Sequence, residues 1–372
     1  MTGPTRCTDE AADLLLLDAL PGVGPVTVGE LVRAFGSASR AIRARGEDFA
    51  AVAGGEAARA RSDRQLRTTV TESVRRAEAL GISVISWNDR AYPRGLRHLA
   101  DPPPVLFLRG AVELLDRPCV TIVGARRATE RARDVSRRLA RELTRAGNVV
   151  VSGLALGVDG AAHRGALDGR GGTIAVLGTG ADVPYPRTHR RLFDDIAAQG
   201  LLVTEFVPGT GAAPHHFPRR NRILAALATT VVVIEAASRS GSLITVDHAL
   251  DLGLDVWAVP GPIEQAACAG SNRLLSEGAR PLVAIGDFVA RVSALGGPPP
   301  EELPVSDLPV GVAGPATLEA RALAVLSAEG IPIDAVAGRL EVPVETALAL
   351  LTMLELHGEV ERLPGMRFRR AA

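Results

Sequence analysis

The chain contains 372 residues, of which 47% are hydrophobic, and this length and composition suit two or three globular domains. Its 42 basic residues balance 42 acidic residues, so the formal net charge is zero. This balance excludes a uniformly basic surface, and any site for a polyanion must therefore be a local one.

Residues 1–85 form a first zone with a helical pattern. Its early apolar run, 14–17, is too short for a signal peptide or membrane span and follows acidic residues, which predicts a cytoplasmic protein without membrane contact. The segment 20–24, Leu-Pro-Gly-Val-Gly, separates this run from the amphipathic stretch 26–35 and indicates a helix, a glycine hairpin and a second helix. Exposed amides in such a hairpin can hold a DNA phosphate, although an ordinary helical connection fits the same pattern.

Residues 86–295 alternate short β-branched runs with helical stretches. Six runs are apolar on both faces, which predicts a parallel sheet covered by helices on each side, in a doubly wound α/β domain. The predicted strands are 120–123, 149–152, 173–177, 201–205, 230–235 and 256–259. Between the first two we expect a helix over 130–146, with Thr129 as its N-cap and Gly147 as its C-terminal stop.

The C-terminal part begins with a linker, 296–315, that is rich in proline and glycine. Residues 316–372 then predict three short helices, beginning near Thr317, Ile333 and Pro343, and a hairpin around Pro364-Gly365, which is the outline of a winged helix. The third helix, 344–357, has no arginine and carries two glutamates, so a protein contact is at least as well supported as a DNA contact.

Glycines, hydroxyls and arginines follow the predicted strands of the central zone. In an open parallel sheet, ligands bind beyond the carboxyl ends of the strands. Glycines let a ligand approach the backbone, helix N-termini offer unpaired N–H groups, and arginines complete an anion site. The segments at these ends are Gly124 to Thr129, Gly153 to Asp159, Gly178 to Gly180, Phe217 to Arg222 and Ser238 to Thr245.

The segment Phe217 to Arg222 places an aromatic ring, three arginines and an asparagine within six positions. An aromatic ring that stacks on a base, next to guanidinium groups on the backbone, is typical of proteins that bind single-stranded nucleic acid. From Arg126 to Arg145 there are eight further arginines, which a solvated helix face explains equally well.

Cofactor, metal and catalytic patterns are weaker. The turns lack the Gly-x-Gly-x-x-Gly fingerprint, so we expect no dinucleotide cofactor. Asp159 and His163 fit a helix cap and a packed histidine better than an acid–base pair or metal ligands, and Ser240 and Ser242 lack a nucleophile elbow. The pair 215–216 (His-His) and the three cysteines have no metal-binding spacing, which predicts no metal and free thiols.

These segments in this order closely resemble the DNA-processing protein A family (DprA, also called Smf). The resemblance rests on Gly124-Ala125-Arg126, Ser152 to Asp159 with His163, Gly178-Thr179-Gly180, Arg220-Asn221-Arg222, Ser240 to Thr245 and Pro260-Gly261. It implies an N-terminal helical domain like a sterile alpha motif, an extended Rossmann-like central domain and a C-terminal winged helix. It also implies single-stranded DNA binding without catalysis, cooperation with single-strand-binding protein, loading of the recombinase RecA during natural transformation, and a homodimer.

Carried over to this sequence, the resemblance places Gly124 and Arg126 in a phosphate-binding turn and the segment 217–222 along the DNA groove. Ala125 stands where the family usually has serine, and Val158 where it usually has isoleucine. The predicted nucleic-acid-binding residues are Gly124, Arg126, Arg127, Gly153, Phe217, Arg219, Arg220, Asn221, Arg222, Ser240, Gly241 and Ser242.

The alternative hypothesis is a Rossmann-like enzyme that resembles nucleoside monophosphate phosphoribohydrolases. Those enzymes carry a Pro-Gly-Gly-x-Gly-Thr signature with a nearby glutamate. This chain has Ser240 to Thr245 in the corresponding region, and Glu235 alone is a thin basis for catalysis. The sequence therefore favours a non-catalytic mediator that binds single-stranded DNA.

Overall fold

The computed structural model describes residues 7–295 and, in the C-terminal part, 322–323, 325–326, 330–340, 342, 344–356, 360–363 and 367–370. The chain divides into two compact units, Met1–Pro299 and Pro300–Ala372. The predicted linker 296–315, the helix start near Thr317 and the turn at Pro364-Gly365 lie outside the described residues. The domain boundaries predicted from the sequence stay predictions.

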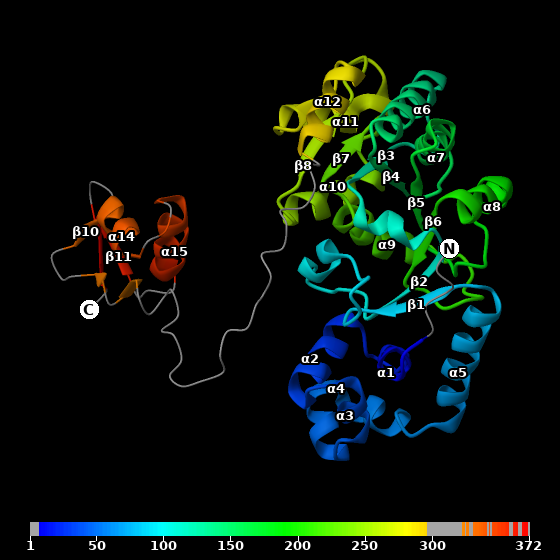
Figure 1. Ribbon diagram of the computed structural model, residues 1–372, viewed down its shortest axis with the longest axis vertical. Coiled ribbons are helices and arrows are strands. Elements are labelled where there is room, and N and C mark those ends of the chain that lie inside the picture. Colours follow the sequence, from blue (N-terminus) through cyan, green and yellow to red (C-terminus); the bar gives the residue numbers. More distant parts are fainter. Residues whose placement is uncertain are drawn as a thin grey trace. The chain divides into compact units, whose positions relative to one another are not determined.

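Five helices open the first unit: α1 (Asp9–Asp18), α2 (Pro25–Phe35), α3 (Ala38–Arg43), α4 (Gly46–Ala60) and α5 (Arg64–Ala79). Thr8 caps α1, and Gly22 adopts φ +71° in the connection to α2. Leu14, Leu31 and Phe49 share one apolar core with residues of the first two strands, so the helices cover that end of the sheet (Figure 1).

A nine-stranded sheet forms the centre of the first unit, in the order β1-β2-β6-β5-β4-β3-β7-β8-β9. Its strands are β1 (Ser83–Ser86), β2 (Val105–Gly110), β3 (Cys119–Val123), β4 (Val149–Ser152), β5 (Thr173–Val176), β6 (Leu201–Thr204), β7 (Thr230–Val233), β8 (Asp255–Ala258) and β9 (Arg280–Pro281). All six predicted strands are present, and β3 to β9 pair in parallel. The predicted α/β fold is confirmed, with an antiparallel β1–β2 pair added at one edge.

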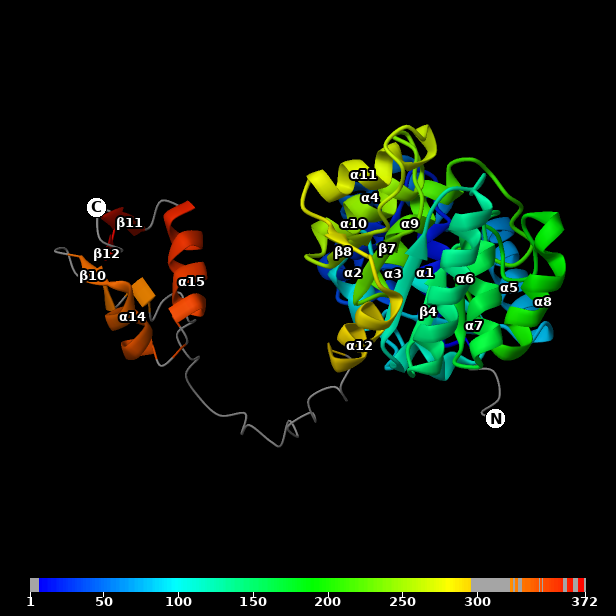
Figure 2. The ribbon, with the colours of Figure 1, turned by 90° about the horizontal axis from the view of Figure 1, so that it is seen from above.

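Helices cover both faces of this sheet, as the doubly wound pattern predicts (Figure 2). One face packs against α6 (Glu130–Arg145), α7 (Val158–Gly169), α8 (Arg190–Gln199) and α12 (Ile285–Leu295). The other packs against α9 (His216–Ala226), α10 (Ser242–Asp251) and α11 (Ala269–Ser276). Short 3-10 turns lie at Arg94–His98, Val112–Asp116, Arg187–His189 and Ala266–Cys268.

Helix α6 shows how local sequence sets these boundaries. The Thr129 hydroxyl accepts the Ala132 N–H at 3.1 Å and caps the helix start. Gly147, just after the helix, adopts φ +91°, a conformation that glycine takes without strain. The predicted cap and stop are both confirmed.

The strand order creates a switch point at the carboxyl end of the sheet. From β3 the chain adds β4, β5 and β6 on one side, and then returns to place β7 and β8 on the other side of β3. The loops after β3 and β7 therefore leave the sheet in opposite directions and open a crevice between them.

The second unit contains β10 (Ile331–Pro332), α14 (Ile333–Leu340), α15 (Val344–Leu356), β11 (Val360–Leu363) and β12 (Arg367–Arg370). Its strands form an antiparallel sheet in the order β10-β12-β11, and Val336, Leu351 and Phe368 lie in its core. The third predicted helix ends at Leu356 in the described residues. Arg369 on the hairpin pairs with Glu361 at 2.5 Å.

Of the helices within the described ranges, none combines the length and the apolar character needed to cross a bilayer.

Candidate nucleic-acid interface

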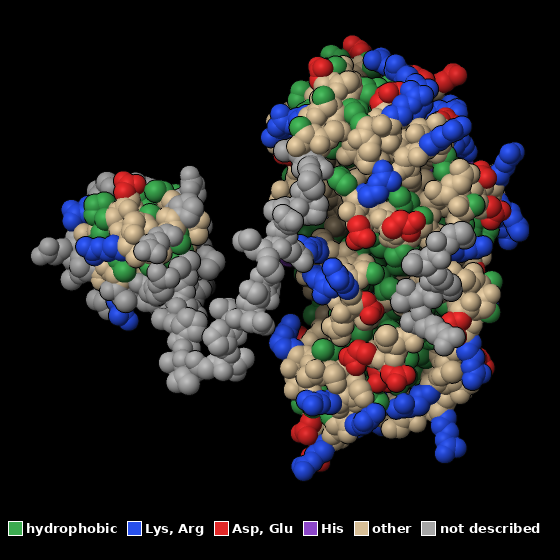
Figure 3. All heavy atoms as spheres, viewed as in Figure 1, with side chains coloured by type: hydrophobic (Ala, Val, Ile, Leu, Met, Phe, Trp, Pro, Cys, Tyr) green, Lys and Arg blue, Asp and Glu red, His purple; other side chains and the backbone are tan. Residues whose placement is uncertain are grey.

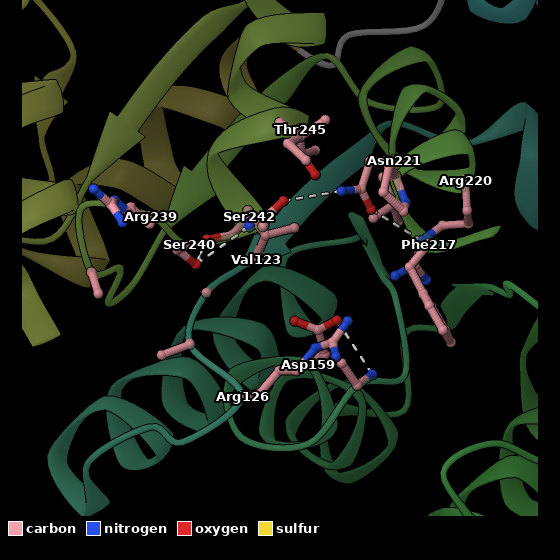
Figure 4. Close-up of a pocket in the computed structure, with 18 of the residues that line it drawn as sticks. Val123, Arg126, Asp159, Phe217, Arg220, Asn221, Arg239, Ser240, Ser242 and Thr245 are labelled. Atoms are coloured by element: carbon pink, nitrogen blue, oxygen red, sulfur yellow. Dashed lines mark hydrogen bonds between the residues drawn. The ribbon is translucent and has the colours of Figure 1, made fainter. Parts of the chain in front are cut away.

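A cleft of about 540 Å³ occupies the switch point between the loops after β3 and β7 (Figure 4). Eight of the predicted binding residues line it: Gly124, Arg126, Phe217, Arg220, Asn221, Ser240, Gly241 and Ser242. The cleft is therefore assembled from the ends of strands that are far apart in the sequence.

Two glycines shape the turn that carries Arg126. A side chain on Gly124 would lie 2.7 Å from a Val158 methyl group, and one on Gly157 would collide with the Ala125 carbonyl oxygen. Gly157 also adopts φ +77°. The Ala125 N–H donates to the Glu235 carbonyl at 2.7 Å, so the turn is fastened to the end of β7. Arg126 itself is exposed and points into the cleft.

The Arg126 guanidinium lies 5.4 Å from the centroid of the Phe217 ring. This is within the range of a cation–π contact, which restricts the arginine side chain and leaves its N–H donors available for a ligand. The guanidinium beside the Phe217 ring thus comes from the loop after β3, a contact that the sequence analysis did not predict.

Arg220 is buried and ties two strand ends together. Its Nη1 donates to the carbonyl oxygens of Gly153, at 2.8 Å, and of Val176, and its Nε donates to Asn221 Oδ1 at 3.2 Å. Burial lowers the pKa of Arg220 to about 10, and the nearby Asp159 carboxylate opposes this effect. The side chain therefore stays charged at neutral pH, and its positive potential reaches the cleft.

Asn221 and three hydroxyl groups line the cleft on the side of α10. The hydroxyl groups are those of Ser240, Ser242 and Thr245. Asn221 Nδ2 donates to the Gly241 carbonyl at 3.1 Å, and the Ser240 and Ser242 hydroxyls lie 2.7 Å apart at the start of α10. The Thr245 hydroxyl is buried and, among the described residues, has no hydrogen-bond partner. An unsatisfied buried hydroxyl lining a cleft is available to a ligand.

Asp159 is the one acidic residue among the described residues that line the cleft. We expected it to cap its own helix, but its carboxylate accepts the loop N–H groups of Gly153 and Ala155 at 3.2 and 3.3 Å, and this prediction was wrong. Burial raises the pKa of Asp159, while Arg220 and these two amides lower it. The carboxylate thus holds the loop after β4.

Two buried histidines hold the same loop. Leu154 adopts φ +56°, which is rare for a residue with a side chain. Its N–H donates to His163 Nε2 at 3.3 Å, and its carbonyl accepts from His189 Nδ1 at 3.0 Å. His163 Nδ1 lies 2.8 Å from the Thr173 hydroxyl, so the neutral ring has both nitrogens paired. His163 packs beneath the helix as predicted.

The buried His163 should make the protein sensitive to acid. Burial, followed by His189 and Arg220, lowers its pKa to about 3, whereas an unfolded histidine titrates near 6.5. Between these values the unfolded chain binds more protons, so the free energy of unfolding falls as pH falls. We expect this group to remove about 2 kcal/mol between pH 7 and pH 5.

The measurement is urea denaturation of the parent and of His163→Gln at both pH values. The contributions of Asp159 and His189 remain in both proteins, so the difference isolates His163. A variant that loses as much stability as the parent over this range would contradict the assignment.

Four of the predicted nucleic-acid-binding residues do not line the cleft. Gly153 lies just behind the cleft, beneath Arg220, and Arg127 is exposed outside it. Arg219 pairs with Glu205 at 2.8 Å, and Arg222 is buried and pairs with Glu205 and Asp101 at 2.8 and 2.9 Å. Arg219 and Arg222 therefore hold α9 against the end of β6, and their charges are neutralised there.

Sequence reasoning missed three residues of the site. Arg239 and Thr245 line the cleft and belong to a segment already singled out for its serines. Figure 4 places Arg239 on the far side of the cleft from Phe217. Tyr185, in the loop between β5 and α8, lies with its ring centroid 5.4 Å from that of Phe217, and no local pattern indicated it.

Glu235, the acidic residue of the alternative enzyme hypothesis, lies outside the cleft lining. Its carboxylate accepts the Thr129 N–H at 3.0 Å and the Thr129 hydroxyl at 2.6 Å. It therefore supports the start of α6, where a negative charge is favourable.

Replacing Glu235 by glutamine should lower the free energy of unfolding by about 1–2 kcal/mol, because the amide has one oxygen, so the Thr129 N–H and the Thr129 hydroxyl can no longer both donate to separate carboxylate oxygens. Glu130→Gln, an exposed change in the first turn of the same helix, is the matched control and should cost far less. Chemical denaturation compares the two. A larger loss in the Glu130 variant would contradict this role.

Within the described residues, no group of three or more histidine, cysteine, aspartate or glutamate side chains is placed to hold a metal ion.

Comparisons with known proteins agree with this architecture. Residues 83–293 match the family model for DNA recombination-mediator protein A, and residues 306–366 match the model for the DprA winged helix domain. DNA processing protein DprA of Streptococcus pneumoniae is 43% identical over 54% of this chain and 71% of its own length. Protein Smf of Synechocystis is 34% identical over 76% of this chain and 79% of its own length.

Two solved structures are similar as well. DprA of S. pneumoniae matches with a TM-score of 0.65 and 32% identity, over 77% of this chain and 98% of that one. DNA processing protein A of Helicobacter pylori, whose structure was described for its single-stranded DNA binding mode, matches with a TM-score of 0.54 and 31% identity, over 58% of this chain and 97% of that one. The chain therefore belongs to the DNA recombination-mediator protein A family, DprA/Smf, with a winged helix domain at its C-terminal side.

Proposed function

We propose that the chain binds single-stranded DNA in the cleft at the switch point and acts there as a recombination mediator. The observation that carries the proposal is the charge of the cleft: three guanidinium groups, from Arg126, Arg220 and Arg239, face one buried carboxylate. In a chain without net charge, this local excess is the feature that a polyanion would recognise.

The groups that line the cleft differ from the mixture of charges on the face of the first unit that Figure 3 shows. Figure 3 shows basic and acidic side chains scattered together over the visible face of the first unit. In the cleft, by contrast, arginines combine with the hydroxyls of Ser240 and Ser242 at the N-terminal end of α10. Hydroxyls, guanidinium groups and a helix N-terminus are the usual partners of DNA phosphates.

The aromatic side chains beside the cleft favour single strands over duplex. Phe217 lines the cleft, and the Tyr185 ring lies next to it. Bases in a duplex are stacked on one another, whereas those of a single strand can stack on protein rings. The H. pylori relative, described for its single-stranded DNA binding mode, supports the same assignment.

Family membership extends the proposal to the biological role. A mediator of this kind would load RecA onto incoming single-stranded DNA in natural transformation, would work with single-strand-binding protein, and would act in the cytoplasm as a homodimer. The match to DNA recombination-mediator protein A supports this role.

We propose that binding involves no catalysis. A phosphoribohydrolase needs an acid–base group facing the ligand, but Glu235 is engaged with Thr129, and both oxygens of that carboxylate are used. Release of free base from a nucleoside monophosphate by the purified protein would overturn this part of the proposal.

The test is equilibrium binding of the full chain to labelled oligonucleotides of equal length, one single-stranded and one duplex, at several salt concentrations. We expect clearly tighter binding of the single strand, with an affinity that falls steeply as salt rises. Equal affinity for both forms would reduce the cleft to a general polyanion site, and no binding would refute the proposal.

A further inference from the structure

His189 lies just before α8, where this helix packs beside α7 (Figure 1), and its side chain is 6% exposed. Its Nδ1 donates to the Leu154 carbonyl at 3.0 Å, so Nδ1 carries the proton of the neutral ring. Nε2 is then a bare acceptor, and within the described residues it has no hydrogen-bond partner. A nitrogen of a buried ring that lacks a partner can gain one from a ligand.

Arg164 on α7 brings a positive charge to the same place. A Cβ atom on Gly160 would lie 2.9 Å from His189 Nε2 and 3.3 Å from Arg164 Nη1, so both nitrogens surround one bare position of the helix. The Arg164 side chain is exposed and forms no ion pair in the part of the chain that the structure describes. An anion between the two side chains could therefore contact both.

The start of α8 adds further positive charge. Arg190 and Arg191 are its first residues, and its first turn carries no acidic residue. Both arginines are exposed, and among the described residues neither forms an ion pair, although Asp194 and Asp195 follow in the next turn. Cations at a helix N-terminus are unfavourable because they meet the positive end of the helix dipole. A bound anion would relieve this repulsion.

We propose that Arg164, His189 and the first turn of α8 form a binding site for a phosphate-type anion. The anion accepts hydrogen bonds from the Arg164 guanidinium and from a protonated His189 Nε2, while Nδ1 keeps its contact with Leu154. Neither Arg164 nor His189 lines the cleft, so this site is separate from the one in the proposed function and goes beyond it.

Binding at this site should take up a proton on His189. Burial lowers the pKa of His189, the Leu154 carbonyl raises it and Arg164 lowers it, so the net shift is downward and the ring of the empty site is neutral at pH 7. His163, which faces it from α7, has a pKa of about 3 and stays neutral. A dianion beside Nε2 favours the charged ring and raises the pKa. The affinity for the anion should therefore increase as the pH falls.

The test uses sulfate, because it has the shape of phosphate and keeps two negative charges from about pH 5 to pH 8. The full chain is labelled at its histidine carbons, and NMR follows the pH titration of the His189 ring in sodium sulfate and in sodium chloride of equal ionic strength. His189→Asn or His189→Gln identifies the signal by its loss. We expect the midpoint to be higher by about one pH unit in sulfate. Equal midpoints in the two salts would overturn the site.

Arg164→Ala should remove most of the effect of sulfate on the His189 midpoint, because the anion loses a charge-assisted hydrogen bond. Arg170→Ala is the matched control, since Arg170 is an exposed arginine at the other end of α7 and its replacement removes the same charge. This variant should keep the parent response. An equal loss in both variants would overturn the site, because diffuse charge would then explain the effect.

Inorganic phosphate and oligothymidylate show where the anion comes from. A response of the His189 signal to both supports the site and assigns it to a phosphate of a strand that extends beyond the cleft. A response to inorganic phosphate alone supports the site and assigns it to a free anion. The response to sulfate does not require DNA in the cleft, so this inference and the proposed function can fail separately.

Discussion

Replacing Arg222 by methionine should lower the free energy of unfolding by about 3 kcal/mol, because it leaves the buried Glu205 carboxylate with the partly exposed Arg219 in place of its buried partner. The Arg222 and Glu205 side chains are each 3% exposed and are joined by two hydrogen bonds of 2.8 Å. Burial alone would lower the pKa of Arg222, but Glu205 and Asp101 raise it, so Arg222 keeps its charge. Urea denaturation measures the loss.

Two controls separate this effect from DNA binding. Arg219→Ala removes a partly exposed arginine from the same carboxylate and should cost much less. Combining Arg222→Met with Glu205→Leu removes both buried charges and should recover much of the lost stability. Folded Arg222→Met should bind DNA like the parent; a selective loss of affinity at unchanged stability would show that Arg222 contacts the strand.

Replacing Arg126 by alanine should weaken binding of single-stranded oligonucleotides of any sequence by about tenfold or more, because one charge-assisted phosphate contact is lost. The dependence of log affinity on log salt should become shallower by about 0.7, the value for one phosphate contact on a single strand. Arg126 is exposed and lines the cleft, so the fold should tolerate the change. Fluorescence anisotropy across a salt series measures both effects.

Arg127→Ala is the matched control for this experiment. Arg127 is the next residue in the chain and is also exposed, but it does not line the cleft. Its removal should change the affinity and the salt slope much less. Equal effects of the two substitutions would mean that the turn after β3 contributes only diffuse positive charge.

The parallel part of the fold could be predicted from the sequence because its strands are apolar on both faces. Only a strand buried between two helical layers needs that pattern, and all six such runs form strands. The antiparallel β1–β2 pair was not predicted, since Ser83 pairs with Leu108 across a long connection whose course no local pattern specifies.

The contacts of the arginines near the cleft could not be predicted from local sequence either. The sequence places Arg219, Arg220 and Arg222 together, but it does not show which of them meets an acid. Glu205, at the end of β6, reaches Arg219 and Arg222, while Arg220 turns towards the ends of β4 and β5. Neighbours in the sequence thus have different roles, which only the strand order decides.

The central claim is that an unpaired strand lies in the cleft between the loops after β3 and β7. A crystal structure of the protein with oligothymidylate tests it most directly. We expect phosphates beside Arg126 and the start of α10. Clear density for the strand elsewhere on the protein, with the cleft empty, would contradict the claim.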